Sequence, residues 1–274
     1  MIELLSYDFF QNALIAAIFA AISCGIIGSY IVSKRIVFIS GGITHASFGG
    51  VGLGYFMGFN PLWGAGVFAV LASCIIEFLR SKSNIREDSA IGIIWAAGMA
   101  LGILMVSLTP GYAPDLMSYL FGDILTVQST DLWAMGIITA IMTIFFIAAH
   151  QVITAIAFDE SYAKTLKLPV KAINYIIAIL IALTIVANIR ISGIILVISL
   201  MTIPQATAQK FTHQLRYMML HSIWIGFLGL LSGLYFSYLL DIPSGASIIL
   251  SEIGIFVIVQ LIGCFIPSHK TDNT

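Results

Sequence analysis

The chain has 274 residues, of which 59% are hydrophobic and only 9% are charged, and its formal net charge is -1. Soluble domains carry roughly 25% charged residues, so this composition excludes a soluble globular protein and indicates a membrane protein. The small net charge provides no basic face for nucleic acid, and three scattered cysteines, Cys24, Cys74 and Cys264, match neither a disulfide framework nor a zinc motif.

Uncharged runs locate the first membrane spans, because ionisable side chains are costly in hydrocarbon and about 20 apolar residues cross a bilayer. The run between Asp8 and Lys34 predicts one helix. Its acidic N-terminal flank is unlike that of a cleaved signal peptide, so we expect a permanent span. The run from 35 to 77 is long enough for two helices, and the turn residues at 58–61 divide it.

The second predicted span contains two stripes of small residues. The first stripe recurs every four residues and is typical of close helix packing in membranes: Gly42, Ala46, Gly50, Gly54 and Gly58. A second stripe, of Gly41, Gly49 and Gly52, includes His45 as its one ionisable side chain. This histidine is either a neutral core residue bonded to a neighbouring helix or a ligand for zinc, manganese or iron in transit.

The later uncharged runs complete an all-α, polytopic architecture. They predict helices over 88–115, 131–159, 171–190, 190–210, 216–241 and about 247–265, which gives about nine spans, with eight as the alternative count. A short apolar stretch at 116–121 is a candidate re-entrant helix. No linker divides the chain, so we expect one membrane domain over 1–274. Lysine and arginine gather at one side, which places the N-terminus outside and the C-terminus in the cytoplasm.

A charge-dense segment at about 158–171 lies between two apolar runs, on the predicted cytoplasmic side. An ordinary solvated loop would explain its composition. In a membrane protein, one such segment at the water surface could also be a contact site for a soluble partner. We therefore expect a short helix there, whose contact candidates are Asp159, Glu160, Tyr162, Ala163 and Leu166.

Two acidic residues near the last predicted span are candidate partners for His45. Asp241 precedes Pro243 and is equally suited to cap the helix that follows. Glu252 lies roughly 10 Å into that span at 1.5 Å per residue, so we do not expect it at the surface. With His45, these residues are the candidates for a metal translocation path.

No motif brings a nucleophile, an acid and a base together, and the chain contains no phosphate-binding Gly-x-x-x-x-Gly-Lys-Ser/Thr loop. Any ATP chemistry must come from a partner. Four pieces of sequence, in order, resemble the permease subunit of metal-type ABC importers, the bacterial family for zinc, manganese or iron: ITHASFGGV at 43–51, LFGDIL at 120–125, FDESYAK at 158–164 with LPV at 168–170, and LDIPSGA at 240–246.

The resemblance covers nearly the whole chain and implies a transporter subunit of the bacterial cell membrane. It implies a homodimeric pore, two cytoplasmic ATP-binding subunits and an extracytoplasmic metal-binding protein, with membrane lipid around them. It implies no cofactor in this chain, since the metal is cargo and ATP is bound by the partner. The segment from Asp159 to Leu168 would be the coupling helix that contacts the ATPase.

The sequence departs from the family pattern at two positions. Gly41 stands where the family usually has an aspartate, one helical turn before the histidine, which puts a fixed metal site in doubt. Lys167 stands where a glycine is common before Leu-Pro. Two alternative functions remain: an ABC permease for an iron chelate or cobalamin, and a secondary metal transporter that needs no ATPase.

Overall fold

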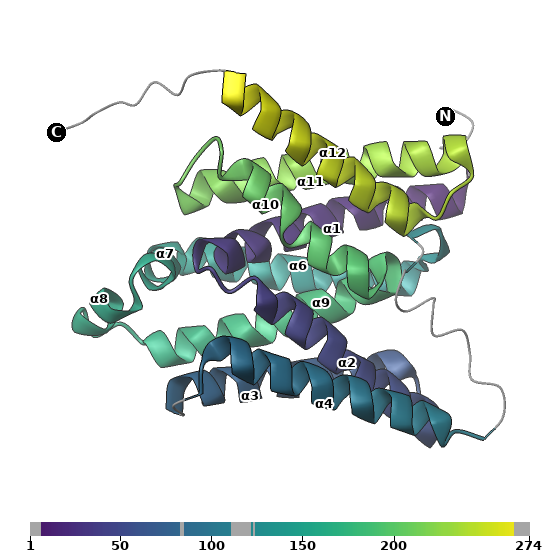
Figure 1. Ribbon diagram of the computed structural model, residues 1–274, viewed down its shortest axis with the longest axis horizontal. Coiled ribbons are helices and arrows are strands. Elements are labelled where there is room, and N and C mark those ends of the chain that lie inside the picture. The colour runs from purple at the N-terminus through teal and green to yellow at the C-terminus, as the bar shows by residue number, and fades with distance from the viewer. Residues whose placement is uncertain (1–6, 83–84, 111–121, 123, 266–274) are drawn as a thin grey trace.

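The computed structural model describes residues 7–82, 85–110, 122 and 124–265, and these residues form helices and no strand. Most of the long helices run along one axis of the molecule, and α2 and α12 cross it obliquely (Figure 1). The elements are α1 (Asp8–Ser33), α2 (Phe38–Met57), α3 (Pro61–Lys82), α4 (Glu87–Ser107), the short 3-10 helix η2 (Ile124–Thr126), α6 (Ser129–Ala148), α7 (His150–Phe158), α8 (Glu160–Thr165), α9 (Val170–Leu200), α10 (Ile203–Ala208), α11 (Leu215–Leu240) and α12 (Ser244–Phe265).

Seven of the described helices are long and apolar enough to cross a membrane, so the predicted count of about nine is not confirmed. The second predicted span is present as α2, which has 20 residues but is rich in glycine and is not among the seven. The predicted span over 190–210 corresponds to a shorter apolar helix, Ser192–Ala208. The candidate re-entrant stretch at 116–121 lies outside the described residues.

The two predicted spans over 171–190 and 190–210 meet close to a break in α9. Gly193 has φ 65° and ψ 171°, which is not helical, so α9 consists of two pieces. The break contacts Gly122, where an added Cβ would collide with the backbone of Gly193. Beyond it, the chain returns toward the other end of the bundle, because Gln209 and His213 line the same cavity as Lys34.

The α1 helix forms the centre of the bundle, since 72% of its apolar membrane-spanning stretch is buried inside the protein. It packs against α6, α9 and α11 (Figure 1). Small side chains permit these close approaches, since one face of the helix consists of fully buried alanines: Ala13, Ala16, Ala17 and Ala20.

The first small-residue stripe of α2 is a packing surface, as its spacing predicts. A Cβ at Gly50 would collide with the carbonyl of Gly64 in α3, and a Cβ at Gly42 would collide with the side chain of Ile91 in α4. The predicted turn between the two helices is also confirmed, because Gly58 ends α2 in the left-handed conformation and Pro61 begins α3. Backbone contact therefore fixes α2 between α3 and α4.

Candidate functional site

His45 lies on α2 and stacks on Trp95 of α4, with ring centroids 4.2 Å apart and an angle of 9° between the ring planes. The imidazole is half-buried, and its Nδ1 atom is buried without a hydrogen-bond partner. Stacking holds the ring in one plane. The free ring nitrogen is the lone-pair donor that a metal ligand requires.

The space around Gly41 lies beside this stack. A Cβ at Gly41 would sit 3.4 Å from Cζ3 of Trp95, which is an ordinary contact. A cavity of about 310 Å³ adjoins it, lined by Gly41, Trp95 and residues of α9 and α10. The fold therefore has room for the aspartate that the family pattern carries at this position, although this chain has a glycine.

Asp241 ends α11 as its C-cap residue, in the left-handed conformation with φ 53° and ψ 48°. It lines a cavity of about 550 Å³ at the turn between α11 and α12, together with Phe9, Leu125 and Ser244. Asp241 was expected either on the metal path or as the cap of the helix that follows Pro243. In the structure, Asp241 is exposed and stands at the end of the preceding helix, α11.

Glu252 is fully buried within the bundle, as its position in the last span predicts. Neither carboxyl oxygen has a hydrogen-bond partner, and the Cγ atom packs where a Cβ of Gly229 in α11 would lie. A buried carboxyl group without a hydrogen-bond partner is costly, so Glu252 is a polar point within an otherwise apolar part of the bundle.

The fold does not bring His45, Asp241 and Glu252 together. Among the described residues, no three histidine, cysteine, aspartate or glutamate side chains form a group that could hold a metal ion. His45 packs between α2 and α4, whereas Asp241 and Glu252 belong to α11 and α12. Within the described part of one copy, the three candidates therefore do not form one metal site.

The charge-dense segment folds as the short helix that its sequence predicts. The side chain of Asp159 accepts a hydrogen bond from the backbone N–H of Tyr162 at 2.8 Å and thereby caps α8. Tyr162 and Leu166 are 57% and 51% exposed, so they present an apolar surface to a partner. Ala163 is fully buried against Ile156 and Val170, so it supports the helix and does not face outward.

Lys167 closes α8 in the left-handed conformation, with φ 56°. Its backbone N–H donates to the carbonyl of Lys164, and the N–H of Leu168 donates to that of Ala163. Glycine adopts this conformation without strain, which explains why glycine is common here in the family. The lysine adopts the same turn.

Glu160 holds α8 against the ends of two long helices. Its carboxylate forms ion pairs with Lys34 at the end of α1 at 3.3 Å, with Arg80 in α3 at 3.0 Å and with Lys164 at 3.0 Å. Arg80 also bonds Glu77, at 2.8 Å. Glu160 was expected as a contact to a partner, but its carboxylate is engaged within the chain.

The electrostatics of Glu160 favour its charged form. Burial by itself raises the pKa of this carboxyl, but hydrogen bonds from Lys164 and Arg80 and the charge of Lys34 outweigh burial and lower the pKa to about 2. A lowered pKa contributes stability that is present above the ordinary value of 4.5 and is lost as the pH falls toward 2. The attachment of α8 therefore persists through the physiological range.

Trp95, Lys34 and Arg80 were not among the residues chosen from the sequence. Lys34 and Arg80 could have been found from the sequence, since each flanks an apolar run on the same predicted side of the membrane as Glu160. The stacking of Trp95 on His45 joins helices distant in sequence, and no local pattern indicates it.

The seven apolar helices and the capped surface helix α8 define a class of protein, a multi-pass membrane protein with one helix exposed for contact at its surface. The chain belongs to the ABC 3 transport family, whose model matches residues 6–263. The resemblance read from its motifs is thereby confirmed, and the chain is a permease subunit of an ABC transporter, not an enzyme.

Several relatives resemble the chain over most of its length. It is 42% identical to the uncharacterized membrane protein slr2045 of Synechocystis, with 91% of this chain and 89% of the relative covered. It is 37% identical to the manganese transport system membrane protein MntC of Listeria monocytogenes, with 94% and 92% covered.

Two solved structures share the fold. PsaBC from Streptococcus pneumoniae in complex with Fab has a TM-score of 0.83 and 32% identity, with 94% of this chain and 93% of that chain covered. An inward-facing conformation of a putative metal-chelate type ABC transporter has a TM-score of 0.71 at 18% identity, with 92% and 86% covered, and it shows the fold alone.

Proposed function

We propose that this chain forms the membrane path of an ATP-driven importer for a divalent transition metal, and that α8 couples it to a cytoplasmic ATPase subunit. The observation that carries the coupling is the geometry of α8. Its apolar side chains Tyr162 and Leu166 face outward, while Glu160 fastens the helix to α1 and α3. A helix attached in this way passes a displacement caused by the partner on to the long helices α1 and α3.

We further propose that two copies of the chain form the pore. In support, the described part of one copy holds no group of three metal-ligating side chains, and pairing two copies doubles every candidate ligand. His45 is the proposed transient ligand on the metal path, while Asp241 and Glu252 are proposed as polar points along it. Asp241 at the outer turn is also suited to receive an extracytoplasmic metal-binding protein, with the N-terminus on that same side and the C-terminus in the cytoplasm.

The cargo is a small cation in this proposal, and two features favour different metals. The relatives named MntC are manganese transport proteins. An imidazole without a carboxylate one turn away suits zinc better than manganese. Uptake of each metal in the presence of the other decides between them, and uptake of an iron chelate or cobalamin instead of a bare metal would favour that alternative.

The experiment for coupling is metal uptake into proteoliposomes that contain the permease and its partner ATPase subunit. We expect Tyr162→Arg to abolish ATP-driven uptake and ATPase association, because the charged side chain replaces an exposed apolar contact. The matched control is Tyr7→Arg, at a site 55% exposed at the other end of the bundle, which should retain ATPase association. Uptake that needs no ATPase at all would instead identify a secondary transporter.

A further inference from the structure

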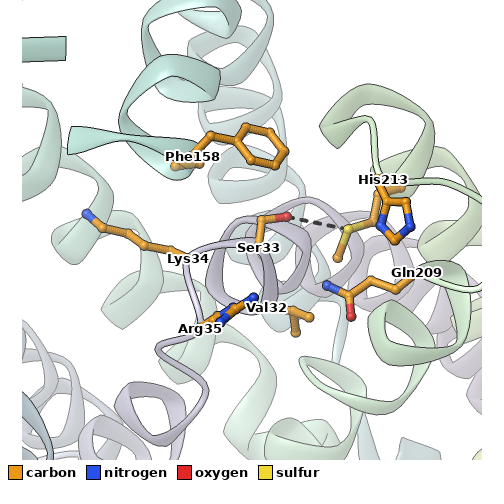
Figure 2. A pocket seen from close by; sticks show the side chains of 9 residues that line it. Val32, Ser33, Lys34, Arg35, Phe158, Gln209 and His213 are labelled. Carbon is orange, nitrogen blue, oxygen red and sulfur yellow. Dashed lines mark hydrogen bonds between the residues drawn. The ribbon is translucent and has the colours of Figure 1, made fainter. Parts of the chain in front are cut away.

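A cavity of about 510 Å³ opens beside α8, at the end of the bundle where α1 and α7 finish. Three segments that are distant in sequence meet around it, namely the end of α1 with the α1–α2 turn, the end of α7, and the α10–α11 turn with the start of α11 (Figure 2). Its lining combines apolar and polar side chains, among them Arg35, Phe158, Gln209, His213 and Met218.

The charged and polar groups of this cavity suit an anion. Among the residues that the structure describes, none of those that line it is acidic, whereas Lys34, Arg35 and His213 line it. Lys34 extends away from Gln209 and His213 in Figure 2, and its ammonium is engaged by Glu160 and Asn174. Within the described part of the chain, the guanidinium of Arg35 has no hydrogen bond or ion pair, and it offers a planar set of donors that matches a carboxylate.

The backbone at Arg35 has an unusual conformation. Arg35 has φ 60°, and the turn is held by hydrogen bonds from its own N–H to Val32 at 3.1 Å and from the N–H of Ile36 to Ile31 at 3.0 Å. Non-glycine residues rarely adopt this conformation, and such residues cluster at functional sites. The tight turn places the exposed Arg35 at the rim of the cavity, between α1 and α2.

The cavity is continuous with the outer surface of α8. Phe158 lines the cavity, is 59% exposed and immediately precedes Asp159, the cap of α8. Lys34 at the opposite rim is joined to α8 by its ion pair with Glu160. The cavity is therefore joined to α8 at Phe158 and, through the ion pair of Glu160, at Lys34.

We propose that this cavity is a second docking site for the cytoplasmic ATPase subunit, and that it receives an aspartate or glutamate side chain of that subunit. The carboxylate pairs with Arg35, while His213 and Gln209 offer further donors and Phe158 and Met218 pack against the methylene groups. This inference rests on the proposed function of α8, and its continuity with α8 is what favours a protein partner over a lipid headgroup.

The experiment uses the full permease in nanodiscs and the partner ATPase, with affinity as the readout. We expect Arg35→Glu to weaken ATPase binding by at least about tenfold, because it places two negative charges together, while Arg35→Lys keeps part of the affinity. The control Lys82→Glu reverses a charge at the end of α3, outside the cavity, and should change binding less than about twofold. A benzoylphenylalanine at Gln209 should cross-link to the ATPase.

Three outcomes separate the explanations, the last from a comparison of nanodiscs with two lipid compositions. If Tyr162→Arg prevents binding and Arg35→Glu leaves it unchanged, the cavity is not a docking site and the function proposed for α8 stands. If both variants bind normally, the proposed coupling through α8 fails as well. If Arg35→Glu weakens binding only in nanodiscs that contain phosphatidylglycerol, and not in pure phosphatidylcholine, the anion is a lipid headgroup and the proposal is overturned.

Discussion

At the scale of single residues, the pair of His45 and Trp95 has the clearest chemical consequence. The stacked indole fixes the plane of the imidazole, its Nδ1 atom is buried without a hydrogen-bond partner among the described residues, and no acidic residue lies within one helical turn of His45 in the sequence. A lone neutral ligand binds a divalent cation weakly, and weak binding lets a transported ion leave. The glycine at 41 is thus consistent with a path that passes metal without storing it.

This reasoning predicts opposite effects for two substitutions. His45→Ala should reduce metal uptake strongly at unchanged protein level, because it removes the proposed ligand. Gly41→Asp should raise metal retention by about tenfold, equivalent to about 1.4 kcal/mol, and slow release. The measurement is uptake together with bound metal per permease.

The isosteric control is Gly41→Asn, which keeps the shape and removes the charge. If His45→Ala and Gly41→Asp both behave like the unmodified chain, His45 is a packing residue and the metal does not pass it.

At the scale of elements, α2 depends on glycine for its place between α3 and α4. The carbonyl of Gly64 occupies the position that a Cβ of Gly50 would need, whereas nothing lies within 4 Å of a Cβ at Gly92 in α4. The two glycines are therefore chemically alike and structurally different. One permits contact between backbones, and the other only adds flexibility to the unfolded chain.

Alanine at each position should separate these roles. Gly50→Ala should destabilise the permease by about 1–3 kcal/mol, since the helices must move apart. Gly92→Ala should be neutral or stabilise it by up to about 1 kcal/mol. Thermal unfolding in detergent, followed by loss of monodisperse protein, measures both. An equal effect of the two alanines would show that α2 and α3 tolerate separation.

Much of this element structure follows from sequence, and the exceptions have physical causes. The boundaries of α2 and α3, the capped helix α8 and the burial of Glu252 follow from charge, turn residues and spacing. The predicted boundary between two spans at 190 lies close to the observed break at Gly193, but its exact position could not be predicted, because a glycine in an apolar run is equally compatible with a continuous helix. The ion pairs of Glu160 depend on which helix ends meet, which a sequence pattern does not contain.

At the scale of the whole molecule, two cavities mark opposite ends of the bundle. One contains Lys34 and His213 beside α8, and the other contains Phe9 and Asp241. Positive residues concentrate at the first end, which is the distribution expected for a cytoplasmic face. The two ends of the bundle therefore differ in charge, and this difference predicts how the bundle is oriented across the membrane, even though few of its residues are charged.

A labelling experiment tests this direction. In a variant without the native cysteines, Asp241→Cys should react with an impermeant maleimide in intact spheroplasts. Lys171→Cys, at the start of α9, should react only after the membrane is opened. Both sites are exposed, so access and not burial decides the outcome. The reverse pattern would invert the proposed orientation.

The break in α9 also has a mechanical consequence. The unbroken part, from 170 to 192, begins directly after the turn that follows α8 and is about 35 Å long at 1.5 Å per residue. Such a rod acts as a lever, because a tilt of about 5° at one end displaces the other by about 3 Å over that length. A small rotation of α8 would thus be magnified into a movement comparable to the diameter of a water molecule, at the point where Gly122 touches Gly193.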